Sequence, residues 1–223
     1  MRLKDVLVLV FVLALVWGFA TPSFRVSYEH AFQRAPILLS FIKFAILATF
    51  GEMLVLRIKQ GVYWTRRFGL FPKMVVWGLL GIAIYWAFVI FSKGVPALMP
   101  SLGEPGSFGA RLVQAAGISV FMNVVFAPPM MLTHHLTDRF IDAYNGSFPI
   151  MKLRVLPLLK GIDWDKMWSF VFVKTIPLFW IPAHTVTFML PTAYRTLFAA
   201  VLSVLLGLIL AFAKHRSPAV KSS

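Results

Sequence analysis

Few residues of this 223-residue sequence could carry chemistry, and several of them interrupt long apolar runs. Lys43 and Glu52 lie in one such run, and Lys174 and His184 lie in another. A charge held at the depth of a lipid bilayer costs at least ~2.5 kcal/mol unless its stem reaches the interface or it faces water. These groups therefore indicate either the lining of an aqueous path or side chains that extend to the membrane surface. Lys43 and Glu52 are about 900° of helical rotation apart, so they project from opposite faces and cannot pair within one helix.

A polar stripe with a spacing of four residues runs through the apolar segment 112–132. Ala115, Ser119, Asn123 and Ala127 fall on one face of a helix there. The amide of Asn123 lies near the middle of the predicted span, where it needs a hydrogen-bond partner or water. Packing between helices and a water-lined path both account for this stripe.

The apolar run 168–190 is interrupted by two prolines, Pro177 and Pro182. Each proline removes a backbone donor and leaves a carbonyl without its helical partner. Such carbonyls are tolerated at membrane depth where a cavity or neighbouring side chains satisfy them. His184 and Thr187 are therefore predicted to line or brace such a place, and a kink that only shapes the bundle is the alternative.

Catalytic and metal-binding patterns are weak. His134 and Asp138 have the i, i+4 spacing of metal ligands and lie beside His135, but zinc normally takes three or four protein ligands. The sequence has no Gly-rich phosphate loop, no GxSxG and no HExxH, and it has only eight acidic residues. We predict that the protein is not an enzyme and holds no metal or cofactor.

The composition excludes a soluble domain and a nucleic-acid-binding protein. Hydrophobic residues make up 59% of the chain and charged residues 13%, which is far more apolar than a soluble domain of this length requires. The net charge is +14, but the basic residues are spread between apolar runs and form no single patch for nucleic acid. The absence of cysteine excludes disulfides and a Cys nucleophile.

The apolar runs predict an all-α, multi-pass transmembrane helix bundle. A helix needs about 20 predominantly apolar residues to cross a hydrocarbon core of about 30 Å. Five core spans meet this requirement: 37–56, 74–92, 112–132, 168–190 and 196–213. A shorter run, 6–20, follows a basic start, so segment 1–20 is either a cleaved signal peptide or a signal-anchor span. We expect 21–216 to form one bundle, with 133–167 amphipathic at the interface and 217–223 as a tail.

The distribution of basic residues predicts the orientation of the spans. When the segments between spans are assigned alternately to the two sides, one side receives 15 Lys and Arg and the other receives 5. The positive-inside rule then places the loops 57–73 and 133–167 on the cytoplasmic side, with the C-terminus. The N-terminus lies on that side too if the first run is retained.

The last span carries a stripe of small residues that predicts close helix packing. Its members, spaced by four, are Ala199, Ser203, Gly207 and Ala211. Helices in membranes pack through small residues that let two backbones approach each other.

Several residues in order resemble a known family. The resembling positions are Tyr28, Phe32, Pro36, Gly51 and Glu52, then Asn123, Phe126, Ala127 and Pro128, and finally Pro191, Tyr194 and Arg195. Together they resemble the Mpv-seventeen and twenty-two-kilodalton peroxisomal membrane protein family, with Glu52 and Met122 at positions where that family usually has Asp. The resemblance implies a small integral membrane protein, channel-like in the better-studied members, of mitochondrial inner or peroxisomal membranes.

These features predict a weakly selective aqueous path for small solutes in a lipid bilayer, formed by one chain or a homo-oligomer. The predicted lining residues are Glu52, Asn123, His184 and Thr187, with Lys43 and Lys174 as charges that bias selectivity. One alternative is an accessory membrane protein whose small-residue stripes contact a partner, and another is a membrane enzyme built on the histidine cluster. The first run is more typical of a signal anchor than of a transit peptide, which favours a bacterial cytoplasmic membrane.

Overall fold

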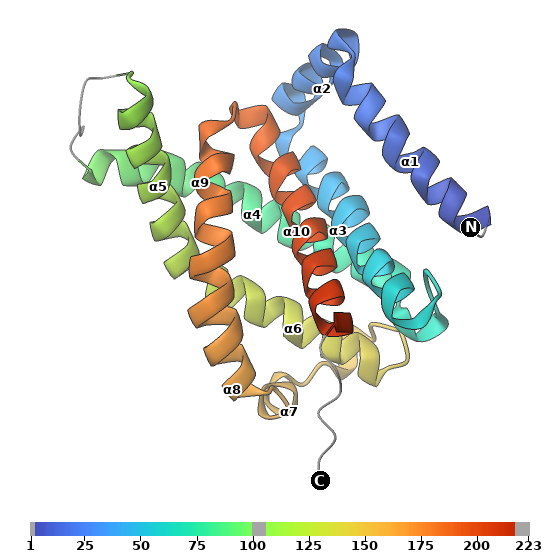
Figure 1. The fold of residues 1–223 in the computed structure, drawn as a ribbon. Helices are drawn as coiled ribbons and strands as arrows, with labels where there is room; N and C mark the ends of the chain where they lie inside the picture. The colour runs from blue at the N-terminus through green and yellow to red at the C-terminus, as the bar shows by residue number, and fades with distance from the viewer. Residues whose placement is uncertain (1–2, 100–105, 217–223) are drawn as a thin grey trace.

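The computed structural model describes residues 3–99 and 106–216, and every regular element in these ranges is helical (Figure 1). Six of its helical segments are long and apolar enough to cross a membrane: Leu3–Ala20, Pro36–Gln60, Arg66–Leu98, Phe108–Val125, Trp164–Met189 and Thr192–Phe212. The chain is therefore an integral multi-pass membrane protein, and the predicted fold class is confirmed. The predicted tail, 217–223, lies outside the described residues.

The helices are α1 (Leu3–Ala20), α2 (Pro22–Arg34), α3 (Pro36–Gln60), α4 (Leu70–Leu98), α5 (Phe108–Val125), α6 (Ala127–Ala143), α7 (Val155–Lys160), α8 (Trp164–Lys166), α9 (Ile181–Met189) and α10 (Thr192–Arg216). Two short 3₁₀ turns, η1 (Arg66–Phe68) and η2 (Ile150–Lys152), lie in the connections, and a π-helix, η3 (Met167–Trp180), joins α8 to α9. Prolines occupy the first turns of α2, α3, α6 and α9, where a missing N–H removes no helical hydrogen bond.

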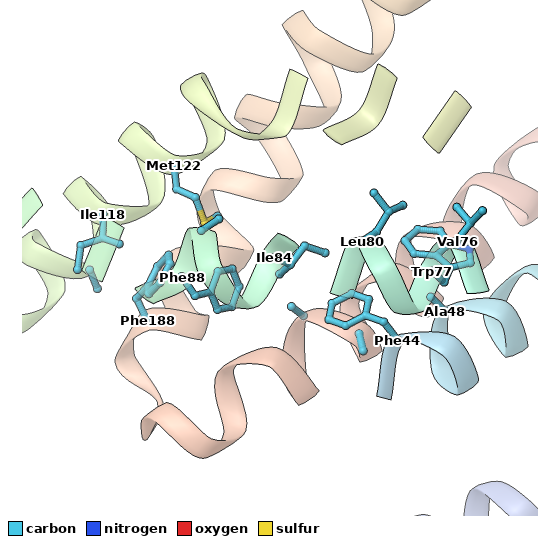
Figure 2. Close-up of a cluster of buried hydrophobic side chains, with 14 of the residues drawn as sticks. Phe44, Ala48, Val76, Trp77, Leu80, Ile84, Phe88, Ile118, Met122 and Phe188 are labelled. Atoms are coloured by element: carbon cyan, nitrogen blue, oxygen red, sulfur yellow. The ribbon is translucent and has the colours of Figure 1, made fainter. Parts of the chain in front are cut away.

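The centre of the bundle is the contact of α3 with α4 and α10. Gly78 and Gly81 of α4 lie directly against Phe41 and Phe44 of α3, because a Cβ at either glycine would fall less than 3 Å from those side chains. Such glycines let two helices approach closely in a membrane. Around this contact, side chains from α3, α4, α5 and α9 form the largest apolar cluster (Figure 2).

The third core span is shorter than the sequence predicts. The expected span 112–132 divides at Phe126, where α5 ends and α6 begins. Pro128 and Pro129 cannot donate backbone hydrogen bonds into α5, so they start a new helix instead of continuing the old one. As a result α6 leaves the direction of α5 and packs against both α4 and α5.

The fifth span, which the sequence predicts to be broken at its prolines, is continuously helical and changes its type of helix instead. The wide-turned η3 contains Pro177 and changes to the ordinary helix α9 at Ile181, next to Pro182. The two prolines therefore flank the change of helix type, and α9 packs along α5.

α1 lies at the edge of the bundle beyond α3 (Figure 1). Only 6% of its apolar window is buried, against 28–44% in the other spans. Its N-terminal end is nevertheless held to α3, because Arg57 donates to both carboxylate oxygens of Asp5 at 2.9 and 3.0 Å. Tyr63 donates to the same carboxylate at 2.8 Å, and the rings of Phe11 and Phe50 lie 5.3 Å apart.

These contacts predict that α1 can be crosslinked to α3 in native membranes. The chain has no cysteine, so Phe11→Cys combined with Phe50→Cys introduces the two thiols that a short bis-maleimide joins. We expect a crosslinked product after trypsin cleaves the α2 segment between the two helices at Arg25 or Arg34, because the two rings are in contact. The control is Leu13→Cys with Phe50→Cys, which places the thiol on the opposite face of α1. Equal yields of crosslinked product for the two cysteine pairs would contradict this docking of α1 on α3. Purified protein from which α1 has been cleaved would contradict it too.

Candidate functional site

A cavity of about 750 Å³ lies inside the bundle, bounded by α3, α4, α5, α6, α10 and the η3–α9 segment. Most of its wall is apolar. One end carries ionisable side chains: Glu52, Lys59, His134, His135 and Lys166. These groups come from the end of α3, from α6 and from α8, next to the loops that the basic residues place on the cytoplasmic side.

A cluster of charges, which we call the Lys73 cluster, joins three helices at this end. The ammonium of Lys73 on α4 lies 2.6 Å from Oε2 of Glu52 on α3 and 2.5 Å from Oδ1 of Asp138 on α6. Nε2 of His134 lies 3.7 Å from one oxygen of each carboxylate. The indole of Trp77 donates to Oε1 of Glu52 at 2.7 Å. Each charge in the cluster is thus paired with an opposite charge or held by a hydrogen bond, as burial requires.

The helices explain why these side chains meet. α3 and α4 are consecutive and antiparallel, so the end of α3 and the start of α4 lie at the same end of the bundle. The proline-induced turn after α5 brings α6 beneath α4, which delivers His134 and Asp138 from one face of a single helix. The ring of His134 also packs on Trp77, with centroids 4.3 Å apart.

Glu52, His134 and Asp138 also have the geometry of a metal site, since their ligand atoms lie within 4.8 Å of one another. The ammonium of Lys73, however, lies between the two carboxylates at hydrogen-bond distance from both. A divalent cation would have to displace this charge before it could reach the same oxygens. The chemistry of the donor set therefore favours an internal ion cluster over a metal centre.

His135 lies beside the cluster at the mouth of the cavity. Partial burial lowers the pKa of its imidazole, and the nearby His134 and Lys166 lower the pKa further. Asp138 opposes this shift without reversing it. His135 is therefore neutral at pH 7, and the cationic groups at the mouth are Lys59 and Lys166.

The inner end of the cavity is formed by Asn123 of α5 and His184 of α9. The amide nitrogen of Asn123 lies 2.9 Å from the carbonyl oxygen of Ser119 and 3.1 Å from Nδ1 of His184. The hydroxyl of Ser119 donates to the carbonyl of Ile181 at 2.7 Å. That carbonyl lies in the first turn of α9 and also accepts a hydrogen bond from the hydroxyl of Thr185 at 2.8 Å. The polar stripe on α5 therefore contacts the start of α9. The indole ring of Trp180 stacks on His184 at 5.1 Å.

The structure brings together three of the six predicted lining and selectivity residues. Glu52, Asn123 and His184 line the same cavity. Thr187 is fully buried outside it and donates to the carbonyl of Ala183 at 2.9 Å. Lys174 is exposed on the outer face of η3. Lys43 is buried at the other end of α3, away from this cavity.

The predicted packing stripe on α10 lies toward α3 and the cavity. Ala199, Ser203 and Gly207 line the cavity, and Ala211 is buried. A Cβ on Gly207 would lie 3.2 Å from Cγ2 of Val55 on α3. This face of α10 therefore packs against α3 of the same chain.

Sequence reasoning did not assign a role in the site to Lys73 and Trp77. The basic, aromatic composition around these two residues is typical of side chains that anchor a helix at the membrane interface. The available signal was that Glu52 and Lys73 carry opposite charges and flank the same connection between two antiparallel helices.

A second, smaller pocket of about 220 Å³ lies toward the opposite end of the bundle, between α2, α4 and α10. Phe88 of α4 lines both this pocket and the large cavity. Its side chain is 4% exposed and packs on Phe188 at 5.0 Å and, edge to face, on His184 at 5.6 Å. Phe88 is thus part of the wall between the two spaces, and it lies beside Phe188 in the apolar cluster (Figure 2).

No family model, curated protein or solved structure matches this chain. The family resemblance of the sequence therefore stays a prediction. The class of the protein rests on its six apolar helices.

The Lys73 cluster predicts a large loss of stability when its central charge is removed. In Lys73→Gln, Glu52 and Asp138 face each other without their counter-charge, which should cost about 3 kcal/mol of unfolding free energy. Unfolding in mixed detergent micelles measures this change, and Lys160→Gln, at an exposed lysine on α7, is the control. Adding Glu52→Gln should recover part of the loss, because the two positions are coupled. If Lys73→Gln unfolds like Lys160→Gln, the cluster contributes nothing to stability.

Proposed function

We propose that this protein provides a weakly selective path for small solutes across a membrane. The observation that carries the proposal is that two internal spaces, one toward each end of the bundle, share Phe88 as a wall. Lys73 beside the large cavity and Lys93 at the small pocket are 20 residues apart on α4, about 30 Å at 1.5 Å per residue. This separation matches the thickness of a hydrocarbon core.

Phe88 is placed to act as the closed gate of this path. An apolar constriction blocks solutes and ions by excluding water, without any covalent or ionic barrier. The ring of Phe88 is held by Phe188 and His184, both on α9. Because α9 follows the proline-flanked change of helix type, a small movement of this segment would change the support of the ring.

The chemistry of the cavity supports weak selectivity. Its volume of about 750 Å³ is within the range of roughly 300–1,000 Å³ of small-molecule pockets, so size alone admits many small solutes. Its polar groups carry both signs, and Lys73 already neutralises Glu52. Asn123 and His184 offer a neutral amide and an imidazole at the inner end.

The remaining features are consistent with transport without catalysis. Lys73 lies between the carboxylates that a metal-dependent enzyme would use. The order of residues that resembles a channel-like membrane protein family supports the same function. The path is formed by one chain or by a homo-oligomer. The small-residue stripe on α10 contacts α3 of the same chain, which leaves less of it for an accessory role with a partner.

The gate is tested by efflux of size-graded neutral and charged solutes from liposomes that contain the purified protein. Phe88→Leu should increase the efflux rate about tenfold if the lost ring contributes ~1.4 kcal/mol to the barrier. Leu is preferred to Ala at this position because it leaves a smaller cavity in the core. The matched control is Phe121→Leu, at an exposed position on α5, which should leave efflux unchanged.

Empty liposomes give the background, and size-exclusion chromatography shows that each variant is folded. No efflux above background from folded, inserted wild type and Phe88→Leu alike would contradict the proposal. An accessory role without transport would then be the better interpretation.

Asn123→Leu tests whether the inner end of the cavity belongs to the path. Replacing the amide with an apolar side chain next to His184 should slow efflux, because permeating solutes and water lose a hydrogen-bonding group there. Val124→Leu, at an exposed neighbour on α5, is the control for expression and folding. Unchanged flux in a folded Asn123→Leu protein would assign Asn123 to helix packing only.

A further inference from the structure

A group of cations and hydroxyls surrounds the small pocket near the start of α10. Lys93 and Arg195 line this pocket, together with the hydroxyl-bearing residues Ser92, Thr192 and Thr196. No carboxylate belongs to its described lining. The pocket therefore presents positive charge and hydrogen-bond donors without a built-in acid to neutralise them.

Arg195 is fixed in place by neutral acceptors. Its Nε donates to the carbonyl of Leu190 at 3.0 Å, and its Nη2 donates to the carbonyl of Phe188 at 3.1 Å. Its Nη1 donates to the hydroxyl of Ser92 at 3.1 Å. A guanidinium has five N–H groups, so donors remain after these three bonds. The hydroxyl of Ser92, which accepts from Arg195, keeps its own proton for another acceptor.

Lys43 adds a buried amine directly behind the pocket. Its side chain is 7% exposed, and its ammonium donates to Oη of Tyr28 at 2.9 Å and to Oγ1 of Thr196 at 2.6 Å. The hydroxyl of Ser40 also donates to Oγ1 of Thr196, at 3.4 Å. Thr196 therefore contacts both Lys43 and Ser40 and also lines the pocket.

The nearest described acidic residue on α2, Glu29, does not neutralise Lys43 or Arg195. Glu29 on α2 accepts a hydrogen bond from Oη of Tyr194 at 2.5 Å and lines a different pocket between α2 and α10. Neither Lys43 nor Arg195 forms an ion pair with a carboxylate of the described chain. A buried charge without an opposite charge is costly, so a bound anion would lower the free energy of the folded state.

We propose that this pocket binds a small oxyanion: a phosphate, sulfate or carboxylate group. The volume of about 220 Å³ corresponds to about seven water molecules at ~30 Å³ each, which accommodates one such group with part of its hydration. Arg195 supplies the charge-assisted hydrogen bonds that oxyanions prefer. Lys93 and the hydroxyls complete the donor set. The group can belong to a free ion or to the headgroup of a lipid.

Calorimetric titration tests the site directly, without any measurement of transport. Inorganic phosphate and sulfate are titrated at constant ionic strength into the purified full chain in a phosphate-free maltoside detergent. We expect saturable binding that Arg195→Gln weakens about tenfold, the effect of losing a charged hydrogen bond. Lys93→Gln, at an exposed lysine that holds no helix end, should also weaken binding. Arg111→Gln, at an exposed arginine on α5 outside the pocket, is the matched control.

The source of the oxyanion is found by repeating the titration in phospholipid nanodiscs and with short-chain phosphatidylglycerol in detergent. Binding of free phosphate in both environments assigns the site to a free ion. Binding of free phosphate only in detergent, with competition by the phosphatidylglycerol, assigns it to a lipid headgroup.

Two results would overturn the proposal. One is the absence of saturable binding of phosphate, sulfate and phosphatidylglycerol to folded wild-type protein. The other is binding that neither Lys93→Gln nor Arg195→Gln weakens more than the control Arg111→Gln does. Because solute efflux is not part of this test, the site and the proposed path can fail independently.

Discussion

The placement of three helices depends on one ammonium group shared by two carboxylates. An unpaired charge near the hydrocarbon is costly, so Lys73, Glu52 and Asp138 are stable there only together. Because they lie on α4, α3 and α6, their pairing fixes the start of α4 against the end of α3 and holds α6 beneath both. The mouth of the large cavity lies at the same contacts, because Glu52 and His134 also line its wall.

The other constraints act through the backbone. Gly78 and Gly81 let α4 lie against the phenylalanine rings of α3, which aligns the two helices along the membrane. Pro128 and Pro129 end α5 early, and only then can α6 carry His134 and Asp138 to Lys73. The prolines flank the change from η3 to α9, where Ser119 on the polar face of α5 donates to the carbonyl of Ile181. Small residues and prolines thus position the charged ones.

Local sequence was sufficient for the fold class, because length and apolarity decide whether a helix can span a membrane. It was insufficient to predict which face of each helix is buried. Lys43 and Lys174 occur in similar apolar surroundings, yet one is buried and the other exposed, because a helix that is apolar on all sides gives no periodicity to fix its rotation. Hydropathy also extended the third span past Pro128, although the two prolines signalled a break. The pairing of Glu52 with Lys73 is tertiary, so the apolarity of the two separate segments does not predict it.

The two ends of the bundle differ in how their charges are compensated, and this difference bears on the proposed path. At the Lys73 cluster each cation has carboxylates within hydrogen-bond distance, so a passing solute meets little net charge. At the small pocket Arg195 is held by a hydroxyl and two carbonyls, which leave its charge uncompensated. Electrostatic attraction would concentrate anions there, next to the Phe88 wall, and repel cations from the same place. The proposed path would therefore favour anions at this end.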